Sequence, residues 1–551
     1  MIPKSLLLAA VASLSWGTAY AAEAAKGTPD ARKQDGKQDA GPAVVPGAGL
    51  FFAPTRSDSD GSVTVGGKAI AYHAVAGTIV VHPKDWDDTA WREQSDSDRA
   101  DKKNAKPEAS LFYAAYFKKG VPSADRPITF LYNGGPGSST VWLHMGAFGP
   151  KRVVTADDSH TPAAPYQLVN NDYSLLDVSD VVFIDAPGTG FSRIAGKDKE
   201  KAFYGIDVDA YAFDQFIKSF LTQYGRWNSP KYLFGESYGT PRSAVLINSL
   251  TTDDNIDFNG VVLLSQILDF NLFAGLQGGN PGNVEGYVTQ LPTYAATAWY
   301  HNRIPGGRPA ALAPFLKEVE HFASTDYASA LAQGDEIDPA TKQQVAEKLA
   351  HYTGLPVDYI LKGDLRIDGP TFSKKLQEES GLTTGRLDTR FSGPDMDPLS
   401  KDADYDPQSA ALSSAYISAF NEYARKDLGY GKDEQFKPMA DVFRYWDWSH
   451  AAPGAPALKM VGTSVLPDLA AAMKFDPQLK VMVNGGYYDA ATPYYQGWYE
   501  MHHLPIPASL QNNIEYHYYE SGHMIYAHQQ SLQQMHDNVA SFIRRTDNIA
   551  N

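Results

Sequence analysis

Short apolar runs alternate along this chain with longer segments whose apolar residues recur at helical spacing. The runs predict strands of the kind that are buried in a parallel sheet, and they span residues 127–132, 178–185, 232–234, 260–264, 479–484 and 514–519. Between the second and third runs, apolar residues from Val208 to Leu221 recur at helical spacing, with Asp207 as N-cap and Gly225 beyond the end. Strands that alternate with helices predict an α/β fold with a mostly parallel central sheet and helices on both faces.

The pattern differs before the first of these runs. Residues 62–65 and 68–81 have the composition of strands, and Gly66-Gly67 separates them. Two such segments joined by a two-residue glycine turn predict a β-hairpin. Residues 109–117 then predict a further strand beside the hairpin, after an exposed charged loop over 84–106.

The alternation is also interrupted in the middle of the chain. From 269 to 473 the sequence indicates helices, such as 339–353 with Asp338 as N-cap and Gly354 at its end. No buried strand followed by a crossover helix is found there. We therefore expect a large helical cap over 269–473, inserted between two parts of one core, 51–268 and 474–551.

The N-terminal residues have the pattern of a secretory signal. Lys4 precedes the apolar stretch 5–16, which is too short to span a bilayer, and small residues follow at the −3 and −1 positions. We expect residues 1–21 to be a cleaved signal peptide. Residues 22–50 lack aromatic residues and have too little apolar surface to fold, so we expect them to be a disordered leader. The absence of cysteine favours a bacterial periplasmic or extracellular location. No other stretch is apolar enough to hold the mature chain in a membrane.

Composition narrows the possible partners and cofactors. The formal net charge is −16 with no basic run, which argues against a nucleic-acid partner. Without cysteine there are no disulfides, thiolate metal sites or cysteine nucleophiles. His523 and His528 lack the spacing of a zinc pair, and the acidic run 395–406 lacks a twelve-residue calcium loop. We expect neither a metal nor another cofactor, and the oligomeric state stays open.

The strand at 232–234 runs into Gly235-Glu236-Ser237-Tyr238-Gly239 and then into an amphipathic helix. Strand, sharp glycine-flanked turn and helix expose a serine hydroxyl at the strand end, although the same pentapeptide also occurs in ordinary turns. A serine nucleophile needs a histidine base and a carboxylate that orients it. Asp489 and His523 each follow a later predicted strand, in the chain order that this turn predicts. All three residues are expected at one sheet edge.

Acyl transfer also needs two backbone amides that bind the developing oxyanion. The amide of Tyr238, directly after the serine, is the first candidate. The second lies in the glycine-rich loop 133–139, which follows the strand 127–132. An ordinary structural turn is the other interpretation of this loop.

Several segments together resemble the serine carboxypeptidase family, whose members have the α/β-hydrolase fold. The resemblance runs in order from about Ala109 to the C-terminal helix, interrupted by the cap. It is carried by Asn133-Gly134-Gly135-Pro136-Gly137-Ser138-Ser139, Asp185-Ala186-Pro187-Gly188-Thr189-Gly190-Phe191-Ser192, Gly235-Glu236-Ser237-Tyr238, Asp489 and Gly522-His523-Met524. It implies that Ser237, Asp489 and His523 form the triad, and that the amides of Gly135 and Tyr238 form the oxyanion hole.

The resemblance also implies a binding site for the terminal carboxylate of a peptide. Asn133, Gly134 and Glu236 would contribute to it, and Met524 would lie near the pocket for the leaving residue. The sequence departs from the family at Ala147, where a second carboxyl group is expected. A carboxyl group beside the nucleophile in a partly desolvated cleft should have a raised pKa, and only its protonated form donates to a substrate carboxylate. We therefore expect better carboxypeptidase activity at mildly acidic pH.

The sequence thus predicts an exported serine carboxypeptidase that acts on peptides with a free C-terminus. Two alternatives stay open. The same triad also serves esterases and acyltransferases, and the family resemblance extends to acyl-transfer members. A catalytically silent protein would use the cleft only to hold peptides, with surface aromatic residues such as Tyr487 and Trp498.

Overall fold

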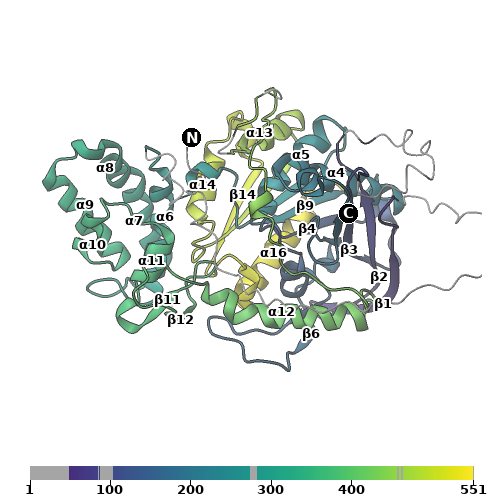
Figure 1. Ribbon diagram of the computed structural model, residues 1–551, viewed down its shortest axis with the longest axis horizontal. Helices are drawn as coiled ribbons and strands as arrows, with labels where there is room; N and C mark the ends of the chain where they lie inside the picture. Colours follow the sequence, from purple (N-terminus) through teal and green to yellow (C-terminus); the bar gives the residue numbers. More distant parts are fainter. Residues whose placement is uncertain are drawn as a thin grey trace, which may run out of the picture.

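The computed structural model describes residues 49–84, 86, 104–273, 282–455, 458–460 and 463–549. The expected signal peptide, nearly all of the expected leader and most of the charged loop lie outside these ranges. A ten-stranded sheet forms the centre of the molecule (Figure 1). Its strands are β1 (Arg56–Val65), β2 (Lys68–Val81), β3 (Glu108–Lys118), β4 (Ile128–Tyr132), β7 (Asp180–Ile184), β8 (Arg193–Ala195), β9 (Lys231–Glu236), β10 (Gly260–Leu264), β13 (Lys480–Gly486) and β14 (Ile514–Tyr519).

The sheet is parallel over most of its width. Its order is β1-β2-β3-β7-β4-β9-β10-β13-β14, with β8 paired to β3. The strands from β7 to β14 pair in parallel, whereas β1, β2 and β3 pair antiparallel. In β10, Leu264 is level with both Glu236 and Asn484. The carboxyl ends of β9, β10 and β13 therefore lie at the same edge of the sheet.

Helices cover both faces of the sheet because its strand residues alternate between two apolar cores. Val261 and Leu263 face α4 (Ile206–Gln223), α5 (Gly239–Thr252) and α13 (Leu466–Phe475). Val262 and Leu264 face α12 (Pro407–Lys426) and α16 (Gln529–Thr546). This is the α/β-hydrolase fold, as the sequence predicted.

A second group of helices has a core of its own. It lies beside the sheet at the left of Figure 1. The group comprises α6 (Glu285–Tyr300), α7 (Leu312–Phe322), α8 (Ala328–Gln333), α9 (Pro339–Thr353), α10 (Val357–Lys362) and α11 (Gly369–Lys375). The predicted helix 339–353 is α9, and the Asp338 carboxylate accepts from the amides of Ala340 and Thr341. Within 269–473, however, α12 and α13 pack on the sheet rather than in this group, because their apolar faces belong to the two sheet cores.

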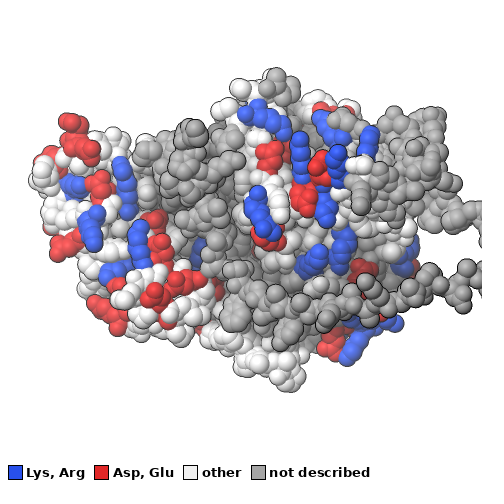
Figure 2. Space-filling view, in the orientation of Figure 1, with Lys and Arg blue, Asp and Glu red and all other residues white. Residues whose placement is uncertain are grey.

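Shorter elements complete the fold. They are β5 (Lys151–Val153), β6 (Leu168–Asn170), α3 (Lys199–Phe203), β11 (Leu382–Thr384), β12 (Ser392–Pro394), α14 (Tyr494–His502) and α15 (Ala508–Gln511). β11 and β12 form a small hairpin inside the stretch that was expected to be helical. None of the described helices is both long enough and apolar enough to span a membrane. Figure 2 shows acidic and basic side chains interspersed on one face of the molecule.

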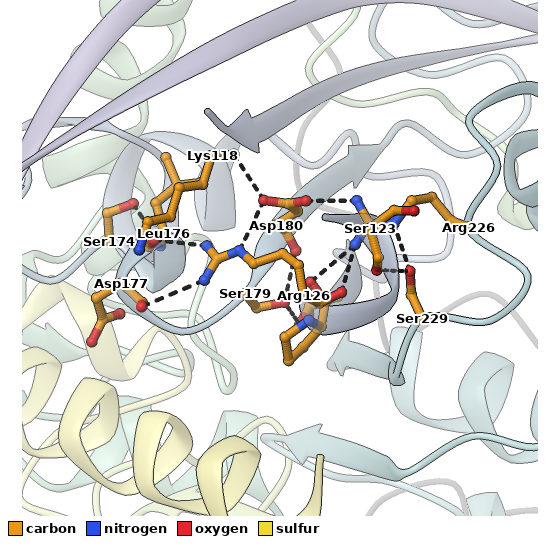
Figure 3. A network of polar contacts seen from close by, with 12 residues as sticks. Lys118, Ser123, Arg126, Ser174, Leu176, Asp177, Ser179, Asp180, Arg226 and Ser229 are labelled. Atoms are coloured by element: carbon orange, nitrogen blue, oxygen red, sulfur yellow. Dashed lines mark hydrogen bonds and ion pairs between the residues drawn. The ribbon is translucent and has the colours of Figure 1, made fainter. Parts of the chain in front are cut away.

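A buried ionic network joins the amino ends of three parallel strands (Figure 3). Asp180, the first residue of β7, accepts from Arg126 at 3.1 Å and from Arg226 at 2.6 Å. These arginines precede β4 and β9 respectively, and all three side chains are at most 6% exposed. Arg226 also donates to the backbone oxygen of Arg126 at 2.7 Å. The network therefore fixes the strands at the edge opposite their carboxyl ends.

Replacing Asp180 by asparagine is expected to destabilise the protein by about 3 kcal/mol, because two buried guanidinium groups lose their shared carboxylate. Urea unfolding measures the change. Because the network lies at the opposite edge of the sheet, kcat per folded molecule should stay unchanged. A loss of less than about 1 kcal/mol, the range of exposed pairs, would contradict this role.

Candidate active site

Ser237 occupies the sharp turn between β9 and α5. Its φ is 60°, a left-handed conformation that is strained for a residue with a side chain. Gly235 and Gly239 make the turn possible: a Cβ on Gly235 would lie 2.1 Å from the Gly239 oxygen, and one on Gly239 would lie 2.9 Å from the Tyr132 oxygen. Ser237 remains partly exposed although its neighbours on both sides are buried. The turn thus presents this hydroxyl at the carboxyl end of the sheet.

Asp489 and His523 form a buried pair at the same edge. Asp489 Oδ2 lies 2.8 Å from His523 Nδ1, and the carboxylate is fully buried. Asp489 Oδ1 accepts from the amides of Ala491 and Thr492, both at 2.9 Å. Oδ2 also accepts from the Thr492 hydroxyl at 2.7 Å. These contacts fix the carboxylate, which in turn orients the imidazole ring.

The charge of Asp489 controls the titration of His523. Burial alone lowers the pKa of a histidine, but the coulombic attraction and hydrogen bond of Asp489 outweigh that effect and raise the pKa of His523 above its ordinary value. A raised pKa makes the imidazole a better proton acceptor. This is the property that a general base for a serine hydroxyl requires.

The serine and histidine turns are both attached to the end of β10. The Ser237 amide donates to the Leu264 oxygen at 2.9 Å. The next residue, Ser265, donates from its hydroxyl to the His523 oxygen at 2.7 Å. Two residues that are far apart in the sequence are therefore anchored to consecutive residues of one strand end, and this brings their turns together.

A segment of the insertion, residues 386–390, also holds the Asp489 and His523 loops. The Leu387 oxygen accepts from the His523 amide at 2.6 Å, and the Arg386 oxygen accepts from Ala490 at 3.0 Å. The buried Asp388 carboxylate pairs with Arg390 at 2.6 Å and accepts from the Gly522 amide at 3.2 Å. This segment could not be predicted from the sequence, because nothing local in its residues shows that it lies against two distant loops.

The glycine-rich loop 133–139 lies against the serine turn. A Cβ on Gly134 would be 2.2 Å from the Tyr238 nitrogen, so only glycine permits this approach. Gly135 has a φ of 104°, which also favours glycine. The buried Arg242 of α5 donates to the Asn133 oxygen at 2.8 Å and pairs with Asp209 at 2.6 Å. Arg242 supports this loop, a role that no sequence motif predicts.

Glu236 is buried directly beneath the serine turn, with 2% of its surface exposed. Burial raises the pKa of its carboxyl group to about 7, partly offset by the positive charge of His523 and by hydrogen bonds from Tyr526 and Asn133. The raised pKa agrees with the expectation from sequence. Ala147, where a second carboxyl group was expected, is fully buried and contributes no acid.

Met524 directly follows His523 and is buried, with 8% of its surface exposed. Three other histidines lie on regular elements: His517 is within β14, His536 is on α16 and His502 ends α14. Among the described residues, no group of three or more histidine and acidic side chains is arranged to hold a metal ion.

Comparison with known proteins finds similarity over part of the chain. Residues 101–330 match the family model described as serine carboxypeptidase. A carboxypeptidase Y homolog of Arthroderma benhamiae is 34% identical over 131 residues, which is 24% of each chain. The pheromone-processing carboxypeptidase KEX1 of Cryptococcus gattii is 26% identical over 233 residues, 41% of this chain and 30% of that relative. The stretch 101–330 of this chain is thus similar to the serine carboxypeptidase family.

The match to the serine carboxypeptidase family model covers only residues 101–330. The matched stretch includes Asn133 and Ser237, whereas Asp489 and His523 lie beyond it and are brought to the site by the fold. The chain covers only about a quarter to a third of the length of the curated relatives it matches. Among solved structures, a proline iminopeptidase from Mycobacterium smegmatis aligns over 90% of this chain and all of its own, with 13% identity and a TM-score of 0.33.

Proposed function

We propose that this protein is a serine carboxypeptidase that hydrolyses the C-terminal residue of peptides. The observation that carries the proposal is the buried Asp489–His523 pair, anchored to the same strand end as the strained turn of Ser237. A buried carboxyl group at Glu236, directly beside Ser237, adds a group that can recognise a terminal carboxylate.

The proposed reaction has two steps. His523 accepts the proton of the Ser237 hydroxyl as the oxygen attacks the scissile carbonyl carbon, and then donates it to the leaving amine. The amides of Tyr238 and Gly135 stabilise the oxyanion in each tetrahedral intermediate. Water then attacks the acyl-enzyme with His523 again as base, which releases the shortened peptide and restores Ser237.

Recognition of the C-terminus is proposed for the groups beside the serine. Asn133, the Gly134 backbone and protonated Glu236 hold the terminal carboxylate, and Met524 borders the leaving residue. We also propose export to the periplasm or the exterior of a bacterial cell, on the pattern of residues 1–21. Sequencing the N-terminus of the protein from the periplasmic fraction tests this, because a cleaved chain begins at Ala22.

A matched set of substrates separates this function from an esterase or acyltransferase. One peptide is supplied as the free acid, as the C-terminal amide and as a simple ester. A carboxypeptidase cleaves the free acid with a much higher kcat/KM than the amide. Equal rates on the two peptides with fast ester cleavage would favour the esterase. Intact, folded protein that a fluorophosphonate does not label would favour the silent peptide-binding protein.

Binding of the free-acid peptide is expected to be tightest at mildly acidic pH. Below about pH 7 Glu236 is protonated and donates to the substrate carboxylate; above it, the carboxylate form repels the substrate. KM for the free-acid peptide should therefore rise about tenfold per pH unit above the pKa, while KM for the ester stays flat. Steady-state kinetics between pH 5 and 9 measure both.

Glu236→Gln is the matched control for this pH dependence. Its amide has nearly the same shape and donates at every pH. The alkaline rise of KM for the free-acid peptide should therefore disappear in the variant. Retention of the same rise in Glu236→Gln would show that another group titrates.

A further inference from the structure

The hydroxyl of Tyr526 points at the carboxyl group of Glu236. Its oxygen lies 2.9 Å from Oε2 and 3.1 Å from Oε1, and the two side chains are among the most buried of the site. Tyr526 belongs to the 3₁₀ turn η10 (Ile525–Ala527), which begins two residues after His523. The histidine and this phenol are therefore carried on one short stretch of chain.

The Tyr526 ring packs on the turn where the expected second carboxyl group is missing. Ala147 lies in the π-helical turn η2 (Leu143–Phe148). A Cβ on the adjacent Gly146 would be 2.6 Å from Tyr526 Cδ2 and 2.7 Å from Tyr416 Cε1. The phenol is thus held rigidly against the backbone of this turn, with its hydroxyl directed at Glu236.

A buried carboxylate ligand needs several hydrogen-bond donors. Asn133 Oδ1 accepts from the Leu143 amide at 3.1 Å, which leaves the Asn133 amino group to donate toward Glu236. Glu236 donates only when it is protonated. Burial and the charge of Glu236 raise the pKa of Tyr526 well above its ordinary value, so this phenol remains a donor over the working range.

We propose that Tyr526 is a substrate-binding residue, whose hydroxyl donates a hydrogen bond to the terminal carboxylate of the peptide and takes the place of an acid at position 147. The proposal rests on the carboxypeptidase function proposed above. In the free enzyme the Tyr526 proton is engaged by Glu236. When the substrate binds, the protons of Glu236, Tyr526 and Asn133 converge on its carboxylate.

Tyr526 also tunes the acidity of Glu236. The titratable groups around Glu236 are His523, Asp489, Tyr526 and Tyr416. The hydrogen bond from Tyr526 stabilises the carboxylate form and so lowers the pKa that burial raises. Without this bond Glu236 stays protonated to higher pH. The rise of KM for the free-acid peptide should therefore begin at a higher pH.

Tyr526→Phe tests the proposal. Loss of a hydrogen bond to a charged group should raise KM for the free-acid peptide about ten- to a hundred-fold at pH 6, with the ester changed by less than about threefold. The alkaline limb for the free acid should also shift to higher pH. Tyr416→Phe is the control, because it removes the neighbouring phenol, whose hydrogen-bond partner is Thr155 rather than Glu236. In this variant KM for both substrates should stay close to the wild-type value.

The possible outcomes separate this proposal from the function on which it rests. A wild-type enzyme that prefers the free acid, with an unchanged KM in Tyr526→Phe, would overturn only the role of Tyr526. Equal losses on free acid and ester would assign the residue to the structure of the site and also overturn the proposal. A wild-type enzyme with no preference for the free acid would overturn both, whatever the variant does.

Discussion

Ser237→Ala is expected to reduce kcat for the free-acid peptide by about 10⁶-fold, the loss found when a triad serine is removed. The reason is that no other group at the site can form the acyl-enzyme. Labelling by a fluorophosphonate should be abolished, because the reagent bonds to the same oxygen. Steady-state kinetics together with mass spectrometry of the labelled protein measure both effects.

Ser243→Ala is the matched control for this variant. Ser243 lies in α5, the helix that follows Ser237, and is fully buried. Its hydroxyl donates to the Gly239 oxygen at 2.8 Å and lies 2.8 Å from the Tyr132 hydroxyl. Its loss should cost about 1 kcal/mol of stability and leave labelling intact. Labelling of Ser237→Ala at the wild-type rate would refute the assignment of Ser237 as the nucleophile.

The regular parts of the fold were predictable because local signals agree with the tertiary structure. The predicted strands 260–264 and 514–519 are β10 and β14 without a shift of either end. The hairpin turn at Gly66-Gly67 joins β1 and β2, and α9 begins and ends where its capping residues indicate. In these elements burial, turn chemistry and capping select the same structure.

The insertion was less predictable, because its sequence does not show which helices share a core. α12 and α13 are amphipathic like α7, yet their apolar faces are completed by the sheet rather than by other insertion helices. The β11–β12 hairpin has strands too short to give a period. Only the packing partner shows whether an insertion helix belongs to the sheet or to the separate group of helices.

The residues of the site likewise include some that the sequence predicts and some that it does not. Ser237, Asp489 and His523 were placed at one sheet edge because each follows a predicted strand, and the structure places all three turns there. The side chains that support them follow no local pattern. Asp388, Arg242 and Tyr526 come from an insertion loop, a helix and a 3₁₀ turn, and each gains its role from a contact with a distant segment.

Asp489→Asn is expected to lower kcat about 10⁴-fold while the fold is retained, as is found when a triad aspartate becomes asparagine. The carboxylate geometry gives the reason. If the asparagine oxygen keeps the two amide bonds of Ala491 and Thr492, its amino group must face His523 Nδ1. That group donates, so the imidazole proton moves to Nε2, and the nitrogen that should accept the serine proton is blocked.

The pH profile gives an independent readout of this change. Since Asp489 is what raises the pKa of His523, the acid limb of ester hydrolysis should move to lower pH in Asp489→Asn. Asp180→Asn is the matched control, because it removes a buried carboxylate at the opposite edge of the sheet. It should lose stability and keep kcat per folded molecule, the reverse of Asp489→Asn. If Asp489→Asn lost less than about tenfold in kcat, His523 would not depend on this carboxylate for its tautomer, and the orienting role would belong to another group.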